Sequence, residues 1–340
     1  MNILADSSLP DLDWLFPKPC HLTTYQNKHE LLHALPHHDV LLCRSTLQVT
    51  PELLAKSTIT CVATASSGVD HIDTDCLHKH QIQLFDAKGC NAEAVSDYVL
   101  STIAYLDTHQ KLPGMRVGIM GAGQVGSRVS TCLKSLGFEV FLYDPPKENT
   151  TPDFISCTLA DFSTCDVLCI HANLHNTPPH PTKNFLDADF IKKLKKNTVI
   201  INAARGGILD EQALLNASKS FVYCTDVYQE EPNICFDIIN YATLCTPHIA
   251  GHSIEAKRDA VFHISQVLHQ YFNLPAPSPK TYPKQRINKL PNTWQTRALT
   301  LYNPIHETMD FKKANNKSTA FLNLRRAHQL RHNFSHYEKE

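Results

Sequence analysis

"VGIMGAGQVGSRV", residues 117–129, carries three glycines in the pattern G-x-G-x-x-G. An apolar, strand-like run precedes the glycines, and a helical pattern that closes at Gly137 follows them. Gly121 would permit a tight turn, Gly123 would let the backbone approach a pyrophosphate at the helix N-terminus, and Gly126 would let helix and strand pack closely. The stretch therefore predicts a dinucleotide-binding unit; a glycine-rich turn in a nucleotide-free domain is the alternative.

The next strand candidate, "EVFLYD", ends in Asp144, eighteen residues after Gly126. A carboxylate at this position accepts hydrogen bonds from the ribose hydroxyls of NAD and repels the additional phosphate of NADP. Strand, glycines, helix, strand and acid thus follow one another in the expected order. The predicted cofactor is NAD.

Short apolar runs alternate with helical patterns on both sides of this stretch. Six strand candidates form the region that contains it: "MRVGIMG", "EVFLYD", "DVLCIHA", "TVIINAA", "FVYCTDV" and "TLCTPH". Four come earlier: "MNILA", "DVLLCRS" (39–45), "TCVATAS" (60–66) and "IQLFDA" (82–87). Long helical patterns cover residues 91–110 and about 253–272. Strands that alternate with helices predict an α/β fold of doubly wound parallel sheets, and six strands are the count of a complete dinucleotide-binding fold.

The overall composition narrows the class of protein. The 340 residues include 32 Lys and Arg against 33 Asp and Glu, which gives no reason to expect a nucleic-acid partner or an anionic membrane surface. No apolar run approaches the roughly 20 residues that span a bilayer, and the N-terminus lacks the pattern of a signal peptide. The 12 cysteines are scattered and are expected to be reduced. We expect a cytoplasmic protein with no metal site.

Three polar residues follow later strand candidates, at the strand ends where open α/β sheets bind ligands. Arg205 stands in "NAARGG", Glu231 in "DVYQEEP" and His248 in "TPHIAGHS". Singly, such an Arg is usually a salt-bridge partner and such a His is usually structural. Together they suit hydride transfer with a 2-hydroxy acid. Arg205 would hold the carboxylate, His248 would move the hydroxyl proton, and Glu231 would orient the imidazole.

These motifs, together with "ATASSGVDHID" and "GAGQVG", resemble those of the D-isomer-specific 2-hydroxyacid dehydrogenases over about residues 1–272. The resemblance implies a Rossmann NAD-binding domain, residues 93–257, inserted into a flavodoxin-like substrate domain formed by residues 1–92 with 258–275. It also implies NAD as the cofactor and a small phosphorylated 2-hydroxy acid as the substrate. A short C-terminal dimerisation segment, residues 285–340, would make the protein a homodimer.

The resemblance assigns further site residues. In addition to the three glycines, it implies cofactor contacts at Gln124, Val125, Asp144, Ala172, Ala203, Ala204, Asp226 and Gly251. It implies substrate contacts at Ser45, Ser66 and His252. His252 replaces a tyrosine of the family pattern and Ala172 replaces a threonine, so the substrate is less defined than the chemistry.

Other functions are compatible with parts of the sequence. Another reaction of the same family, on 3-phosphoglycerate or hydroxypyruvate, is the nearest alternative. A non-catalytic, NAD-sensing protein of the corepressor kind would keep the fold, but the presence of Arg205, Glu231 and His248 argues against it. A basic tail that binds nucleic acid is a third alternative, and the apolar residues in the same segment favour docking to protein instead.

"HELLH", residues 29–33, matches the zinc signature of metalloproteases. The helix can begin near Lys28 and must end before Pro36, which leaves about two turns. Leu31, Leu32 and Leu35 are expected to face a sheet, with His29 and His33 on the outer side. Since no third ligand helix is identifiable, the pair is interpreted as solvated histidines.

The tail differs in composition from the rest of the chain. Residues 273–291, "NLPAPSPKTYPKQRINKLP", are proline-rich and polar, and they predict a linker. Beyond it, apolar residues three or four apart predict one helical stripe, made of Phe321, Leu324, Ala327, Leu330, Phe334 and Tyr337. Such a stripe needs a partner surface, and we expect a second copy of the chain to provide it.

Overall fold

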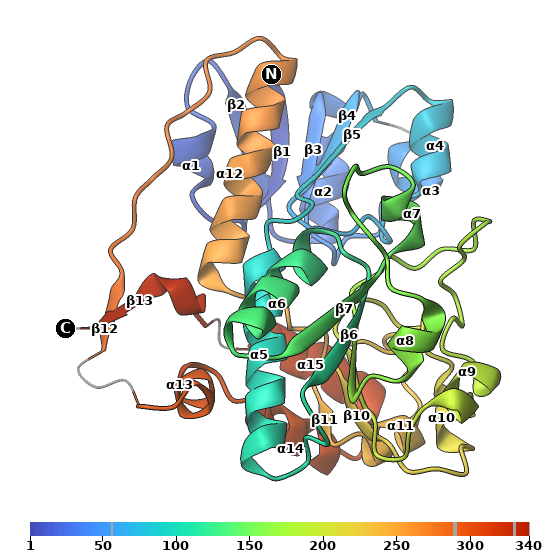
Figure 1. The fold of residues 1–340 in the computed structure, drawn as a ribbon. Helices are drawn as coiled ribbons and strands as arrows, with labels where there is room; N and C mark the ends of the chain where they lie inside the picture. Colours follow the sequence, from blue (N-terminus) through green and yellow to red (C-terminus); the bar gives the residue numbers. More distant parts are fainter. Residues whose placement is uncertain (56, 288–290, 329–330, 340) are drawn as a thin grey trace. The chain divides into compact units, whose positions relative to one another are not determined.

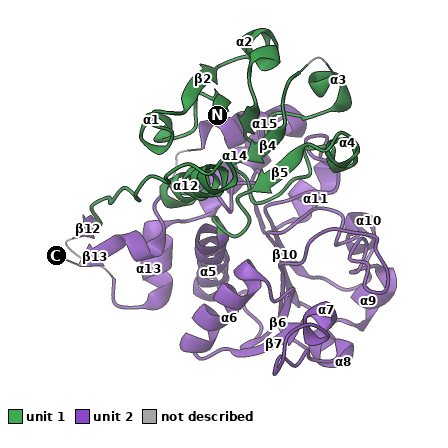
Figure 2. Ribbon diagram, turned by 90° about the horizontal axis from the view of Figure 1, so that it is seen from above, with its two compact units in different colours: residues 1–91, 253–284 green, residues 92–252, 285–340 purple. Residues whose placement is uncertain are grey.

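The computed structural model describes all residues except 56, 288–290, 329–330 and 340. It consists of two compact units, coloured separately in Figure 2. Unit 1 comprises residues 1–91 and 253–284, and unit 2 comprises residues 92–252 and 285–340. The boundaries between the units fall after residues 91 and 252, whereas the sequence predicted domain boundaries after residues 92 and 257. Residues 285–340, expected to form a separate segment, are part of unit 2.

Unit 1 is built on a five-stranded parallel sheet of order β2-β1-β3-β4-β5 (Figure 1), the flavodoxin-like arrangement. The strands are β1 Asn2–Asp6, β2 His21–Tyr25, β3 Val40–Cys43, β4 Cys61–Thr64 and β5 Gln83–Asp86. Its helices are α1 Leu12–Leu15, α2 Lys28–Ala34, α3 Pro51–Leu54, α4 Thr74–Lys79 and α12 Ile254–Tyr271. The sequence missed β2, because "HLTTY" is a largely exposed edge strand with no apolar run.

Both faces of the unit 1 sheet are covered, because alternate strand residues point to opposite sides. Ile3 and Leu42 contribute to an apolar cluster with Val261 of α12. Leu4 and Leu41 contribute to a second cluster with Leu31 of α2. The doubly wound arrangement expected from the alternation of strands and helices is therefore confirmed for this unit.

Unit 2 is built on a six-stranded parallel sheet of order β11-β10-β9-β8-β6-β7. The strands are β6 Arg116–Met120, β7 Glu139–Tyr143, β8 Val167–Ile170, β9 Val199–Asn202, β10 Val222–Thr225 and β11 Leu244–Cys245, each in a predicted run. In the usual dinucleotide-binding order, 3-2-1-4-5-6, a third strand pairs with the outer edge of the second strand. Here β7 is the edge strand, and beyond it Cys157 N–H donates to Leu142 O at 2.7 Å.

Helices flank the unit 2 sheet on both sides. They are α5 Ala92–Thr108, α6 Gln124–Ser135, α7 Pro145–Glu148, α8 Leu159–Ser163, α9 Ala188–Lys193, α10 Glu211–Leu215 and α11 Phe236–Tyr241. Val99 of α5 and Val129 of α6 pack with Ile119 on one face. Phe162, Phe190 and Ile238 pack on the other face. Among the described residues, no helix combines the length and the apolar character needed to cross a membrane.

The C-terminal residues complete both apolar layers of unit 2. The helices are α13 Trp294–Leu301, α14 Ile305–Lys313 and α15 Lys317–Ala327. α13 packs against α5, and α14 packs against β11 and α15. A two-stranded parallel pair, β12 Gln285–Ile287 with β13 Tyr337–Lys339, joins the start of the tail to its end.

The prediction of a single helical stripe in the tail is wrong. α15 ends at Ala327, Phe334 begins a short 3-10 turn, and Tyr337 begins β13, while Leu330 lies outside the described residues. Spacings of three or four continue across these separate elements, so the pattern did not reveal where the helix ends. Phe321 is 2% exposed and packs in its own unit, at 6.1 Å between ring centroids from Tyr228. Its burial does not require a second copy, and the homodimer stays a prediction.

The predicted linker lacks helix and strand over residues 273–284, but it is bound to unit 1. The Trp14 indole N–H donates to Ser278 O at 3.2 Å, and Lys280 pairs with Asp11 at 3.0 Å. Tyr282 hydrogen-bonds the same Asp11 carboxylate. Side chains along this proline-rich stretch thus hold it in place without regular secondary structure.

"HELLH" forms α2, which Asn27 caps by accepting the N–H of Glu30 at 3.0 Å. Glu30, the general base of the zinc pattern, accepts in turn from Gln26 N–H at 2.8 Å and from the Asn27 amide at 2.6 Å. His29 and His33 are exposed, as predicted. Leu32 is also 47% exposed, so the expectation that it faces the sheet was wrong, whereas Leu31 and Leu35 are buried in the apolar cluster on this face.

Candidate active site

The turn after β6 has the geometry that a pyrophosphate needs. Gly121 has φ +89°, and a Cβ there would lie 2.7 Å from the backbone nitrogen of Ala172. A Cβ on Gly126 would lie 1.9 Å from Gly121 O, so helix α6 could not approach the turn. Gly123 caps α6, and a Cβ there would meet nothing within 4 Å. This open side leaves the first N–H groups of α6, including those of Gln124 and Val125, facing outward for an anion.

Asp144 lies beside this glycine turn. It follows β7 and caps α7, with Oδ1 accepting the N–H of Lys147 at 3.1 Å. Its Oδ2 accepts the N–H of Ala122, within the turn, at 2.8 Å. The Lys147 ammonium donates to Ala122 O at 2.6 Å. The carboxylate is therefore held next to the turn, which is the position that recognition of a ribose requires.

Arg205 lies beyond the end of β9, on a turn that its neighbours hold. The Asn202 amide donates to Arg205 O at 3.0 Å and accepts the N–H of Ala204 at 3.2 Å. Arg205 Nη1 donates to Ala204 O at 2.8 Å. A Cβ on Gly206 would lie 1.8 Å from Tyr228 O, so this turn can pack against the next loop only with glycine. Sequence reasoning placed Arg205 here but missed the supporting Asn202 and Gly206 inside the same motif.

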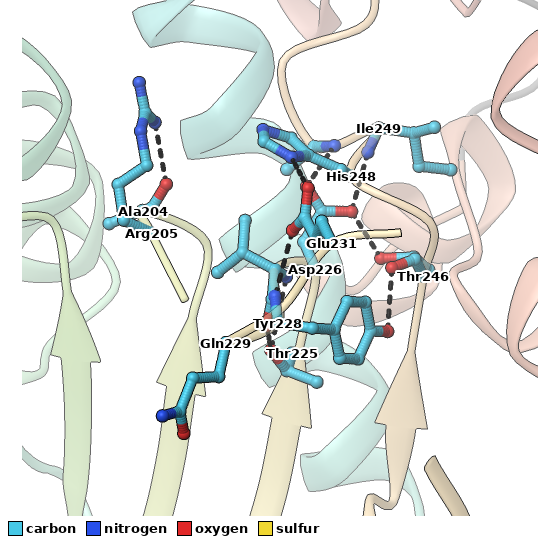
Figure 3. A network of polar contacts seen from close by, with 12 residues as sticks. Ala204, Arg205, Thr225, Asp226, Tyr228, Gln229, Glu231, Thr246, His248 and Ile249 are labelled. Carbon is cyan, nitrogen blue, oxygen red and sulfur yellow. Dashed lines mark hydrogen bonds and ion pairs between the residues drawn. The ribbon is translucent and has the colours of Figure 1, made fainter. Parts of the chain in front are cut away.

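His248 and Glu231 form a close pair beyond β10 and β11 (Figure 3). Glu231 Oε2 lies 2.7 Å from His248 Nδ1, and the side chains are 20% and 30% exposed. The other carboxylate oxygen accepts the N–H of Tyr228 at 2.9 Å. Burial alone would raise the pKa of Glu231, but the charge and hydrogen bond of His248 and the Tyr228 N–H lower it overall. An ionised Glu231 keeps a proton on Nδ1 and leaves Nε2 for exchange with a ligand.

Asp226 supports the loop that carries His248. Its carboxylate accepts from the Thr246 hydroxyl at 2.7 Å, from Ile249 N–H at 2.7 Å and from Ala250 N–H at 2.8 Å. These bonds hold His248 at φ 56°, a left-handed conformation that costs a non-glycine residue about 1–3 kcal/mol. Burial raises the pKa of Asp226 against these bonds and the charge of His248. Asp226 was expected to contact the cofactor; it is 1% exposed, and the donors described here come from its own unit.

Tyr98, whose role sequence reasoning missed, extends this support. Its hydroxyl lies 2.8 Å from the Thr246 hydroxyl, which in turn donates to Asp226. Tyr98 lies in the helical pattern predicted for residues 91–110, so its presence in a helix was visible in the sequence. Its contact with Thr246, 148 residues away, was not visible.

The remaining predicted residues occupy defined places in the two units. In unit 2, Ala172 backs the glycine turn, Ala203 and Ala204 lead into Arg205, and Gly251 and His252 follow His248. In unit 1, Ser45 and Ser66 follow β3 and β4, and the Ser66 hydroxyl accepts the N–H of Ser45 at 3.1 Å. The structure thus brings the two predicted substrate serines together.

Comparisons with known proteins identify the same family that the sequence motifs resemble. Residues 101–250 match the profile of the NAD binding domain of D-isomer specific 2-hydroxyacid dehydrogenases. A Legionella pneumophila (strain Lens) protein named erythronate-4-phosphate dehydrogenase is 51% identical over 338 residues, which cover 99% of this chain and 96% of the relative. A Coxiella burnetii (strain RSA 493) protein of the same name is 37% identical, covering 81% and 75%.

This chain belongs to the D-isomer-specific 2-hydroxyacid dehydrogenase family. Solved structures support the fold of this dehydrogenase. NAD-bound 3-phosphoglycerate dehydrogenase from Entamoeba histolytica superposes with a TM-score of 0.64 at 22% identity, covering 80% of this chain and 95% of that one. NAD-dependent formate dehydrogenase from Staphylococcus aureus, solved with NAD, gives 0.62 at 22% identity, covering 80% and 96%. The predicted fold class, NAD as cofactor and a dehydrogenase activity are confirmed.

Proposed function

We propose that this dehydrogenase oxidises 4-phospho-D-erythronate to 3-hydroxy-2-oxo-4-phosphooxybutanoate with NAD, a step in pyridoxal 5'-phosphate (vitamin B6) biosynthesis, in the cytoplasm. The observation that carries the proposal is the 51% identity to a protein of that name, which extends over nearly the whole chain. The pairing of His248 with Glu231 at 2.7 Å supports it, because such a pair suits removal of a hydroxyl proton.

The residues of unit 2 divide the chemical work. Arg205 binds the substrate carboxylate with its planar, two-pronged guanidinium. His248 Nε2 takes the proton from the C2 hydroxyl, and Glu231 stabilises the resulting imidazolium through Nδ1. NAD, bound at the glycine turn, supplies the acceptor for the hydride that leaves C2. Proton and hydride together leave a carbonyl at C2, so the atoms and charges of the oxidation balance.

The substrate is tested by steady-state kinetics with 4-phosphoerythronate, 3-phosphoglycerate and glycerate, each with NAD. We expect kcat/KM for 4-phosphoerythronate to exceed the others by at least about tenfold, the factor that one lost contact of about 1.4 kcal/mol provides. Arg205→Lys should lower all three values, since all three acids share the carboxylate. A preference for 3-phosphoglycerate or glycerate would assign a different reaction of the family.

We also propose that the chain works as a homodimer, with α14 and α15 at the interface. Met309 on α14 is 47% exposed and Leu322 on α15 is 49% exposed, and these two helices pack together. Leu322→Glu should weaken the dimer in sedimentation experiments. Leu32→Glu in unit 1 is the matched control, because Leu32 is exposed to a similar extent, at 47%. A monomeric wild type, or a Leu322→Glu dimer as tight as the control, would contradict the proposal.

A further inference from the structure

The end of the tail lies against the loop that carries the catalytic histidine. Arg331 is 7% exposed, and its guanidinium donates to three backbone carbonyl groups. Nη1 donates to His252 O at 2.9 Å, and Nη2 donates to Ala250 O and Ala94 O, each at 2.7 Å. The same guanidinium lies 4.3 Å from the centre of the Tyr302 ring. All of these groups belong to unit 2.

The positions of these carbonyls connect the tail to the active site. Ala250 and His252 lie two and four residues after His248, on either side of Gly251. Ala94 lies in the first turn of α5. Arg331 therefore connects the loop that carries His248 to the first turn of helix α5.

The two sides of this loop are supported by different partners. Asp226 accepts the N–H groups of Ile249 and Ala250, whereas Arg331 donates to the carbonyls of Ala250 and His252. Ala250 is consequently bound through both of its backbone polar groups, at 2.8 and 2.7 Å. Since His248 has a left-handed backbone at φ 56°, support from both sides opposes its relaxation to a commoner conformation.

Arginine is suited to this position in a way that lysine is not. Its fixed planar fork can serve several acceptors in different directions, whereas an ammonium is a compact point charge on a flexible stem. Carbonyl dipoles and the Tyr302 ring face balance the buried charge. Asp97 of α5 adds a nearby acidic group and accepts the N–H of Phe334 at 2.8 Å, so α5 binds the tail both at Arg331 and three residues further along the chain.

We propose that Arg331 is a positioning residue for the dehydrogenase reaction, which fixes the His248 loop through the carbonyls of Ala250 and His252. The C-terminal segment then completes the active site of its own chain. The inference rests on the proposed function of His248 as the group that moves the proton.

The test compares Arg331→Lys and Arg331→Met with Arg326→Lys and Arg326→Met in the full chain. Arg326 lies on α15 of the same tail and is exposed. Misplacement of a reacting group by about 1 Å can cost on the order of a hundredfold in rate. We expect kcat to fall about tenfold to a hundredfold in the Arg331 variants, more for Met than for Lys, with NADH affinity within about threefold of wild type. The Arg326 variants should match wild type in both.

A second readout separates positioning from mere packing. A looser His248 contact with Glu231 should move the NMR signal of the His248 Nδ1 proton upfield in the Arg331 variants but not in the Arg326 variants, since that signal reports the 2.7 Å hydrogen bond to the carboxylate. The NMR measurement needs no substrate. A shifted proton signal in the Arg331 variants, alongside a wild type inactive on every acid tested, would support positioning and reject the proposed substrate.

Two outcomes would overturn the inference. Folded Arg331 variants with unchanged kcat and an unchanged His248 Nδ1 proton signal would show that Arg331 only packs the tail. Loss of NADH binding together with loss of a cooperative thermal transition in both Arg331 variants would make it a folding residue.

Discussion

The two sheets share a strand order and differ in the turn that follows the first strand. β2-β1-β3-β4-β5 in unit 1 corresponds strand for strand to β7-β6-β8-β9-β10 in unit 2. After β6, Gly121 and Gly123 lead directly into the 12-residue helix α6, which contains the third glycine, Gly126. After β1, the chain turns through Ser7 and Ser8 to the four-residue helix α1, and Asp6 pairs with Arg44 at 2.9 Å. Equal topology therefore does not give equal chemistry; the residues of the turn decide whether a nucleotide can bind.

The carboxyl ends of the strands differ in the same way. In unit 2 they carry an arginine, a glutamate and a histidine, the last two paired at 2.7 Å. In unit 1 they carry the ion pair of Asp6 with Arg44 and two serines, of which the Ser66 hydroxyl accepts the backbone N–H of Ser45 at 3.1 Å. Hydroxyl groups can bind a substrate but do not exchange protons near neutral pH. We therefore expect changes at the strand ends of unit 2 to affect the chemical step most strongly.

The largest effect is expected for His248→Asn. Asparagine keeps a polar side chain but cannot take up the substrate proton, and general base catalysis typically contributes about 10²–10⁴-fold to the rate. We expect kcat to fall by this order while NADH still binds, measured by its fluorescence. A variant with kcat within about tenfold of wild type would place the base elsewhere and remove the main difference between the units.

Arg205→Lys should have the next largest effect on activity. Lysine keeps the charge but not the two-pronged contact, and a loss of about 2–4 kcal/mol in transition-state binding lowers kcat/KM roughly thirtyfold to a thousandfold. Arg116→Lys is the control, since Arg116 makes an exposed contact with Glu139 at 3.7 Å in the same unit. Equal, small effects of both changes would exclude Arg205 as the carboxylate site.

Asp144→Ser should change the choice of cofactor. Serine still caps a helix N-terminus, so α7 is expected to remain intact while the negative charge beside the glycine turn is lost. We expect the preference for NAD over NADP to narrow by about tenfold, corresponding to about 1.4 kcal/mol. The measurement is kcat/KM with each cofactor. A wild type that uses both equally well would contradict the role of Asp144.

Ionisation of the Glu211 carboxyl group should make unit 2 less stable as pH rises. Burial, with the charges of Glu231 and Glu230 adding to it, raises the pKa of Glu211 to about 7 from 4.5, although its carboxylate accepts the N–H of Gln229. The folded state thus holds a proton that the unfolded state releases above pH 4.5. Stability from this group is complete below that pH and is lost as pH rises through 7, by up to about 3 kcal/mol.

Glu211→Gln tests this titration by thermal unfolding at pH 5 and pH 8. The amide keeps an acceptor for Gln229 but does not ionise. We expect the variant to lose less stability than wild type between the two pH values. An identical pH dependence would mean that Glu211 does not titrate in this range.

The smallest effect is expected for the double change His29→Ala and His33→Ala in unit 1. Both side chains are exposed on α2, and neither residue is next in the sequence to Ser45 or Ser66, the predicted site residues of that unit. Activity should stay within about twofold of wild type, as for surface changes outside special features. Zinc analysis of the purified protein accompanies the assay. Stoichiometric zinc lost with this change would revive a metal role for the motif.

The sequence by itself determined the features that arise from local pattern. Each strand of unit 2 lies in a predicted apolar run, because a buried parallel strand must be apolar on both faces. The glycine turn, Asp144, Arg205, Glu231 and His248 were located from their motifs, since spacing along a strand–turn–helix unit fixes which backbone positions must lack a side chain and which strand ends carry polar groups.

The tertiary structure decided which surfaces meet. Phe321 is buried within unit 2, and Leu32 is exposed. Asp226 hydrogen-bonds the loop of His248, and Arg331 donates to Ala250 of the same loop. A helical or extended pattern states only that one face is apolar, and many surfaces of the same chain could cover it. Contacts such as that of Arg331 with Ala94, 237 residues apart, depend on how all the intervening elements pack. No local pattern records that packing, so the support of the active-site loop became visible only in three dimensions.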